Sequence, residues 1–278
     1  MNLKSIENFC IKPNILISSM YYDDASKSLY CVEKINGSIF VVEMDNNFQF
    51  NTIVSDDSLT NPNWITKDGS ETLLIADSGN HRIIQYNIKT KKNRSQLEYG
   101  RNGNGKVRNP SCIIPSEKYF YVFDYENYLI QVFDKVNFNF IEQFGGKGYE
   151  VNQFDLSTAG FFDDNKLYIA DRNNDRILKY NENTKNISEI ISPTFVPGRL
   201  RRPVRVSTDS KDNIYIADRD NDCIQIFDKN NGHKSIVAKT KKAQSYIENP
   251  MPPRPPSFCT GCPERPIMAA LKMLMQER

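Results

Sequence analysis

The sequence predicts an all-β protein, a β-propeller with five recognisable four-stranded blades, followed by a proline-rich segment and a short C-terminal helix. The main observation is a repeat of five segments: LYCVEKINGSIFVVE (29–43), LLIADSGNHRIIQYN (73–87), FYVFDYENYLIQVFD (120–134), LYIADRNNDRILKYN (167–181) and IYIADRDNDCIQIFD (214–228). The acidic residues that close the first halves, Glu33, Asp77, Asp124, Asp171 and Asp218, are 44, 47, 47 and 47 residues apart. A period of about 45 residues is typical of a propeller blade.

Each repeat has the same order of expected strands. A short apolar run, often after a proline, predicts an inner strand, as in NPNWITKDG (61–69), NPSCIIPSE (109–117) and RPVRVSTDS (202–210). An apolar and aromatic strand ending in the acid follows, then a polar turn of about four residues and an alternating strand such as RIIQYN. A fourth strand closes each unit, as in FNFIEQFG or HKSIVAKT (233–240). No helix of ordinary length fits inside the repeat.

These units resemble NHL repeats, which combine a proline-led strand, an IYVAD-like strand, an SGNHRI-like turn and a QVFD-like strand. IADSGNHRIIQYN and IADRDNDCIQIFD match closely, and the resemblance spans Ser18 to Thr240, with departures at Glu33 and at Tyr125–Asn127. The linkers YGRNGNGKVRNP (99–110) and FGGKGYEVNQF (144–154) resemble the glycine-rich link of the family. The resemblance implies a propeller domain over residues 1–249, with 1–17 as a candidate closing strand. Family members often have six blades, so this ring either closes with five or lacks one.

Composition excludes few classes of function. The chain has 278 residues and a net charge of +2, too balanced to indicate nucleic acid or membrane binding by itself. The N-terminus lacks the apolar stretch of a signal peptide, and no run of about 20 apolar residues occurs. The six cysteines are therefore expected to be reduced thiols in a cytoplasmic protein.

Charge distribution is more informative, because alternating strand directions place the turns between second and third strands on the same face as the links between blades. We expect a basic contact surface on this face, made of Arg82, Arg101, Lys106, Arg108, Arg176, Arg199, Arg201 and Arg202. Its densest part is VPGRLRRPVRV (196–206), which is either a solvated linker paired with Asp220 and Asp222 or an anchor for an acidic peptide or a phosphate backbone.

The resemblance to NHL propellers implies a non-catalytic binding or scaffold function. The family binds protein partners and, in some members, single-stranded RNA on a basic face. A protein or peptide is the expected partner here, since the only aromatic residues available for base stacking in these loops are Tyr125, Tyr128 and Tyr149. No membrane and no small-molecule substrate are expected.

Enzymatic alternatives remain open. The series of strand-end acids suggests either a cation site near the axis, as in lactonase-like hydrolases, or strand ends that accept backbone N–H bonds from the next turn; the repetition in every blade favours the latter. Zinc-dependent lyases among propellers use several histidines, whereas this chain has only His81 and His233, which we expect at opposite ends of their blades. No catalytic residue, metal or cofactor is predicted.

The last segment, residues 250–278, differs from the repeats. It holds the cysteine pair Cys259 and Cys262 in a proline-rich stretch, which is half of a tetrahedral zinc site. PPRPPSFCTGCPERPIMAALKML resembles the opening of the thiamine-diphosphate domain of indolepyruvate ferredoxin oxidoreductases, without the Gly-Asp-Gly cofactor motif. The resemblance leaves an alternative function, an accessory fragment of a ferredoxin-dependent 2-oxoacid oxidoreductase.

Overall fold

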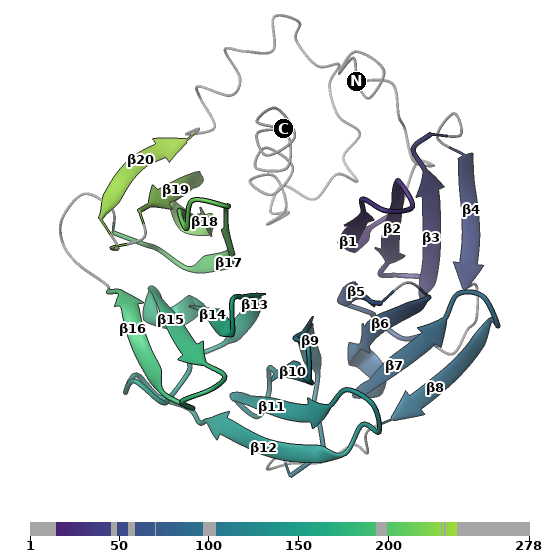
Figure 1. Ribbon diagram of the computed structural model, residues 1–278, viewed down its shortest axis with the longest axis horizontal. Coiled ribbons are helices and arrows are strands. Elements are labelled where there is room, and N and C mark those ends of the chain that lie inside the picture. Colours follow the sequence, from purple (N-terminus) through teal and green to yellow (C-terminus); the bar gives the residue numbers. More distant parts are fainter. Residues whose placement is uncertain are drawn as a thin grey trace, which may run out of the picture. The chain divides into compact units, whose positions relative to one another are not determined.

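The computed structural model describes residues 15–45, 49–54, 59–69, 71–96, 104–192, 199–228, 230 and 232–237. It confirms the all-β fold class, with five four-stranded antiparallel sheets that have the strand order of propeller blades (Figure 1). Within these ranges the only helices are three-residue 3₁₀ turns. The predicted C-terminal helix, and the candidate closing strand before residue 15, lie outside the described residues. The chain divides into two compact units, Met1–Gln143 and Phe144–Arg278.

The first unit contains three blades. Blade one consists of β1 (Ile17–Asp23), β2 (Ser28–Glu33), β3 (Ser38–Glu43) and β4 (Gln49–Val54). Blade two consists of β5 (Trp64–Asp68), β6 (Thr72–Asp77), β7 (Arg82–Asn87) and β8 (Lys92–Gln96). Blade three consists of β9 (Pro110–Pro115), β10 (Tyr119–Asp124), β11 (Leu129–Asp134) and β12 (Phe140–Gly145), the last of which crosses the boundary between the units.

The second unit contains two blades. Blade four consists of β13 (Ser157–Asp163), β14 (Lys166–Asp171), β15 (Arg176–Asn181) and β16 (Ile187–Ile191). Blade five consists of β17 (Pro203–Thr208), β18 (Ile214–Asp218), β19 (Cys223–Phe227) and β20 (His233–Val237). The second and third strands of every blade therefore coincide with the repeated segments, within one residue at each end.

Turn residues explain why the strands reverse where they do. Between β13 and β14, Asp163 pairs with Lys166 across a two-residue turn, and Asp164 and Asn165 have φ angles of 45° and 57°. Two positive φ angles define the type I′ turn, whose twist matches that of the flanking strands. Aspartate and asparagine tolerate this left-handed backbone better than most residues do.

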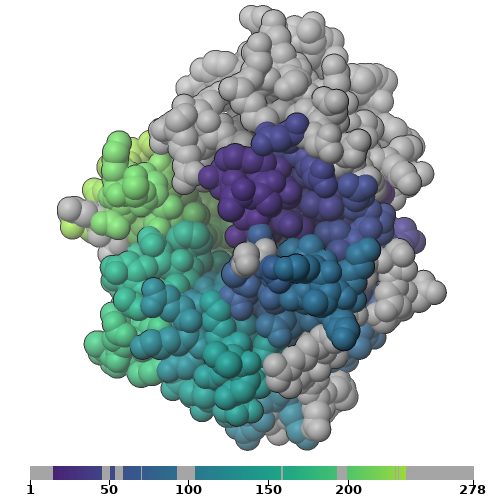
Figure 2. Space-filling view, turned by 45° about the vertical axis from the view of Figure 1, so that its right-hand side comes forward, coloured from purple at the N-terminus to yellow at the C-terminus, as the bar shows by residue number. Residues whose placement is uncertain are grey.

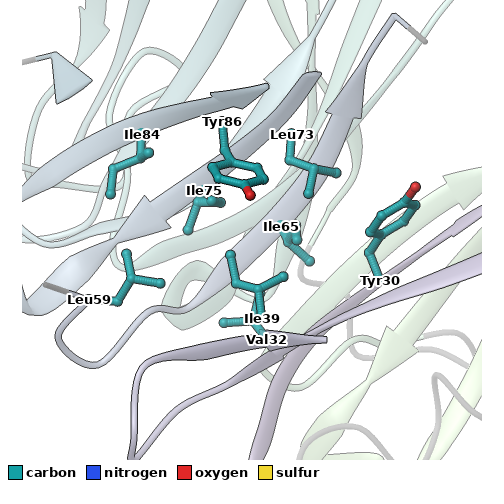
Figure 3. Packing of buried hydrophobic residues seen from close by; sticks show 9 residues of the cluster. All are labelled: Tyr30, Val32, Ile39, Leu59, Ile65, Leu73, Ile75, Ile84 and Tyr86. Atoms are coloured by element: carbon teal, nitrogen blue, oxygen red, sulfur yellow. The ribbon is translucent and has the colours of Figure 1, made fainter. Parts of the chain in front are cut away.

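The core lies between blades rather than inside single sheets. One cluster joins blades one and two; Val32 and Ile39 face Ile65, Leu73 and Ile75 (Figure 3). Corresponding clusters join blades two and three, and blades four and five. Within each unit, neighbouring blades thus stabilise one another through the apolar faces of their sheets.

The inner strands lie side by side within each unit without pairing to one another. Strand β5 lies next to both β1 and β9, and β13 lies next to β17 (Figure 1). Figure 2 shows the residues of blade one, in purple, against those of blade two, in blue. Side-chain packing and a few hydrogen bonds, rather than a strand ladder, therefore hold neighbouring blades together.

We expect Leu73→Ala to lower the free energy of unfolding by about 2–5 kcal/mol, because it opens a cavity at a fully buried site of the cluster between blades one and two. Ile35→Ala is the control, since Ile35 is 70% exposed and the change should cost less than about 0.5 kcal/mol. Urea unfolding measures both values. Equal losses would show that the interblade cluster does not carry the stability assigned to it.

Candidate functional site

The four strand-end aspartates, in blades two to five, each join their blade to the link that leads into it. Their Oδ1 atoms accept the backbone N–H of one link residue: Thr60 on Asp77 (2.7 Å), Arg108 on Asp124 (2.9 Å), Asp155 on Asp171 (2.9 Å) and Arg201 on Asp218 (2.7 Å). The carbonyl of the same link residue accepts the N–H two positions after the aspartate: Gly79 (2.8 Å), Glu126 (3.4 Å), Asn173 (3.0 Å) and Asp220 (3.1 Å). We call this pair of bonds the strand-end clamp.

The second carboxylate oxygen is held by the turn that follows. Three residues after each aspartate an asparagine donates its side-chain N–H to Oδ2: Asn80 (2.8 Å), Asn127 (2.8 Å), Asn174 (2.8 Å) and Asn221 (2.6 Å). Asn127 fills this position like the others, so the departure of blade three from the repeat pattern does not interrupt the contact. Glu33 differs, because its longer side chain accepts the N–H groups of Ile35 (2.9 Å) and Asn36 (2.5 Å) in its own turn.

A further donor to Oδ2 comes from the third strand and takes one of two forms. In blades two and four it is an arginine five residues after the aspartate, Arg82 (2.6 Å) and Arg176 (2.8 Å). In blades three and five it is a glutamine seven residues after it, Gln131 (2.7 Å) and Gln225 (2.6 Å). Positions two apart on a strand face the same side, so either residue reaches the same oxygen.

The clamp aspartates are buried acceptors rather than an open site. Burial raises the pKa of Asp124 to about 6 and also raises the pKa values of Asp171 and Asp218, although their hydrogen bonds oppose the shift. A cation would have to displace the N–H donors that already fill these oxygens. In the part of the chain that the structure describes, no group of three or more His, Cys, Asp or Glu side chains is placed to hold a metal ion.

Neighbouring blades are also joined at the ends of the 3₁₀ turns. His81 and Asp175 follow η2 (Ser78–Asn80) and η3 (Arg172–Asn174) in left-handed conformation. His81 Nδ1 accepts the N–H of Asn109 (3.0 Å), and Asp175 Oδ1 accepts that of Arg202 (2.7 Å). Different side chains therefore make the same contact at two junctions.

Three of the predicted contact residues are used inside the protein. Arg82 pairs with Asp77 as described above, and Arg108 Nε lies 2.7 Å from Glu126. Arg176 is buried; its Nη1 lies 3.0 Å from Glu189 Oε2, and its Nη2 donates to backbone carbonyls. These arginines position the turns and links; Arg82 and Arg108 remain partly exposed, with 27% and 29% of their side-chain surface accessible, whereas Arg176 is buried.

The exposed members of the predicted set are Lys106 in the first unit and Arg199, Arg201 and Arg202 in the second. Arg202 Nε lies 3.6 Å from Asp220, as the solvated-linker interpretation expects. The side chain of Arg201 makes no ion pair within the described ranges. Leu200, which lies between Arg199 and Arg201 in the sequence, is fully buried in the cluster that joins blades four and five and holds this link in place. Arg101 lies outside the described residues.

The remaining candidates occupy separate places. His81 belongs to the first unit, whereas His233 lies in the second, at the start of β20, with its ring 5.2 Å from that of Phe227. Cys31, Cys112 and Cys223 are buried and form no disulfide within the described ranges, and Cys259 and Cys262 lie outside the described residues. Over the described ranges, no helix is both long and apolar enough to cross a membrane.

Sequence reasoning missed two features of this region. The asparagine column is visible in the aligned repeats as Asn36, Asn80, Asn127, Asn174 and Asn221, and it was a readable signal for the turn. That an arginine or a glutamine of the third strand donates to the strand-end aspartate can be recognised only once the strand register is known.

Comparison with known structures finds chains of similar fold. A chain from the "Crystal structure of Nidogen/Laminin Complex" is 18% identical, with a TM-score of 0.66 over 83% of this chain and 82% of that one. Virginiamycin B lyase from Staphylococcus aureus is 16% identical, with a TM-score of 0.64 over 84% and 74%. A catalytically inactive variant of that lyase with Quinupristin is 14% identical, with a TM-score of 0.63 over 84% and 73%. At these identities the likeness is one of fold.

One segment of the chain also matches a sequence family. Residues 200–227 match the NHL repeat, which supports the resemblance drawn from the aligned segments. The match begins at the link of blade five and ends with β19. None of the curated proteins matches the chain.

We expect Asp124→Asn to flatten the pH dependence of stability between about pH 4 and pH 6. The folded pKa of about 6 exceeds the ordinary value of 3.8, so the folded state holds this proton more tightly than the unfolded state. The stability that this group contributes is therefore full below pH 4 and is lost as the pH rises through 6, by about 1.4 kcal/mol for each pKa unit. Urea unfolding at several pH values measures the slope.

Asp212→Asn is the control for this change, because Asp212 is exposed and asparagine tolerates its φ of 60°. Its pH profile should follow that of the unaltered protein. If the unfolding free energy of Asp124→Asn changed with pH as steeply as that of the unaltered protein, the buried carboxylate of Asp124 would not be the source of the pH dependence.

We expect His81→Ala to destabilise the junction of blades two and three by about 1–3 kcal/mol, since it removes the acceptor for the N–H of Asn109. Alanine also tolerates the φ of 54° poorly. His81→Asn should retain most of the stability. Asparagine tolerates this backbone conformation, and its side-chain oxygen can accept the N–H of Asn109, as Asp175 Oδ1 accepts that of Arg202. Denaturant unfolding and hydrogen exchange at Asn109 measure the effect; equal stability of the two variants would contradict it.

Proposed function

We propose that the chain is a non-catalytic binding module that engages a protein or peptide partner through the link and turn surface of blades four and five. The observation that supports it most directly is the link into blade five. There Leu200 is buried and holds the backbone, while Arg199, Arg201 and Arg202 are exposed around it. A guanidinium binds carboxylates in a defined bidentate geometry, and on a fixed backbone only the side-chain rotamers remain to be ordered on binding.

Local charge favours a peptide over single-stranded RNA. The arginines of the link are interspersed with exposed acids, Asp220 and Asp222 among them. A phosphate chain carries a negative charge at every nucleotide and would meet these acids repeatedly, whereas a peptide can place single carboxylates against single arginines. RNA binding is therefore the less favoured interpretation of the same surface.

Enzymatic functions receive no specific support from the described residues. A lactonase-like hydrolase would need carboxylates free to bind a metal, and the clamp aspartates already accept hydrogen bonds from backbone and side chains. The oxidoreductase alternative rests on residues 250–278, outside the described ranges. One of the similar chains comes from a complex of nidogen with laminin, which is compatible with a binding function. We also propose a cytoplasmic location, which is compatible with the three buried cysteines that form no disulfide within the described ranges.

We expect Arg199→Glu combined with Arg201→Glu to weaken partner binding at least about tenfold at ~0.15 M salt, without a change in the thermal unfolding midpoint. The full chain is used as bait in cell extract, and its partner is then purified and titrated. Lys211→Glu is the matched control, an exposed cation of the same blade in the turn between β17 and β18. It should bind as the unaltered chain does.

Two outcomes would overturn the proposal. Loss of the captured partner after RNase treatment, but not after protease treatment, would assign the surface to RNA. Equal weakening by Lys211→Glu and by the double variant would show that net charge, rather than this link, determines binding.

A further inference from the structure

The link between blades three and four contains a loop whose backbone is held rigidly. In the Tyr149 loop, residues 146–155, Phe154 donates its N–H to Gly146 (2.7 Å), Gly148 donates to Phe154 (3.1 Å), and Gln153 donates to Glu150 (2.9 Å). Phe154 is fully buried, and its ring centroid lies 6.2 Å from that of Phe144. The loop is thus closed by its own hydrogen bonds and anchored by an aromatic side chain.

The 3₁₀ turn of blade four holds this loop from one side. Asn174 Nδ2 donates to the carbonyl of Gly148 (2.8 Å). Arg176 Nη2 donates to the carbonyls of Glu150 (2.8 Å) and Gln153 (3.0 Å). The strand-end clamp at Asp155 and Asp171 ties the end of the loop to the same turn.

Two apolar side chains are nevertheless directed to solvent from this rigid backbone. Tyr149 is 77% exposed and Val151 is 44% exposed. Single exposed apolar residues are common on protein surfaces. These two lie only two residues apart on an ordered backbone, so a partner that covers both loses little backbone conformational entropy on binding.

The same turn also holds the link with the exposed arginines. Asp175 lies between Asn174, which contacts the Tyr149 loop, and Arg176, and it accepts the N–H of Arg202. The turn of blade four is therefore flanked by the Tyr149 loop and by the link that carries Arg201 and Arg202. All of these residues belong to the second unit.

We propose that Tyr149 and Val151 form the apolar anchor site of a peptide-docking surface, with Arg201 and Arg202 as its cationic rim. This inference rests on the proposed function and specifies its ligand, an acidic peptide segment that carries an aliphatic or aromatic side chain. The complementary features are the exposed ring of Tyr149 and the side chain of Arg201, which has no ion-pair partner within the described ranges. Tyrosine and arginine are among the residue types that most often dominate the binding energy of protein interfaces.

The preference for peptide over RNA follows from the same residues. Tyr149 is the one strongly exposed aromatic side chain among the described residues of the second unit, so successive bases would find a single stacking partner. Glu150 lies beside it and is exposed, which disfavours a phosphate at that point. A peptide can place one apolar side chain on Tyr149, away from the charge of Glu150, and its carboxylates at the arginines.

Fluorescence anisotropy with the full chain tests the proposal. The probes are a labelled glutamate-rich peptide with a central leucine and tryptophan, the same peptide with serine at both positions, and labelled oligouridine of equal length. We expect the chain to bind the first probe most tightly. Tyr149→Ser combined with Val151→Ser should weaken that binding about tenfold and abolish the preference over the serine probe, while Tyr149→Phe should bind as the unaltered chain does.

Val136→Ser is the matched control, since Val136 is 84% exposed and lies in the first unit, in the turn between β11 and β12. It should leave binding unchanged. Unchanged binding by the Tyr149 and Val151 double variant, together with weakened binding by Arg201→Glu, would overturn the anchor and leave the proposed function standing. Tighter binding of oligouridine, or a Kd weaker than about 1 mM for every peptide, would overturn both.

Discussion

The buried carboxylate at the end of each second strand is the interaction on which most of the structure depends. A carboxylate removed from water costs several kcal/mol unless charge-assisted hydrogen bonds replace its hydration. The four clamp aspartates accept these bonds from three parts of the chain: the link, which is distant in sequence, and the following turn and the third strand, which are near. Each aspartate therefore fixes the entry of the inner strand, the shape of the turn and the position of the third strand at once.

The two forms of the third-strand donor show how much freedom this arrangement leaves. Arg176 brings a positive charge and further bonds to backbone carbonyls, whereas Gln131 brings an amide whose Oε1 also accepts the N–H of Gly105 (2.9 Å). Burial is the largest influence on the pKa of Asp171 as well as of Asp124, so a cationic partner does not by itself offset desolvation. Arg176, Gln131 and Gln225 share one property, because each connects its carboxylate to the backbone of the preceding link.

Local sequence patterns predicted the strands, because alternation and turn residues can be recognised over a few neighbouring positions. Of the hydrogen-bond partners of the aspartates, only those close in sequence could be predicted. Asn80 and its equivalents lie three positions away and recur in every repeat, but Thr60 and Arg201 precede their aspartates by 17 residues. A contact at that separation follows from the packing of the link, which no local pattern specifies.

The arginines illustrate the same limit. Arg176 and Arg201 look equally available in the sequence, yet one is buried among acceptors and the other is exposed. The difference depends on the position of each residue relative to the clamp, since a residue five positions after the aspartate faces the carboxylate. The sequence predicted Tyr149 in a loop, together with Tyr125 and Tyr128, but not the fold of that loop, which depends on Arg176 and Asn174 from a distant turn.

The clamp also divides each blade into parts with different tolerance for change. The segment that matches the NHL repeat, residues 200–227, begins at the clamped link and ends with the third strand, so it leaves out β20. All the partners of the carboxylate lie inside this three-stranded segment. The chain that follows the outermost strand, up to the next link, is consequently the place where insertions, epitope grafts or accumulated divergence would least disturb the clamp.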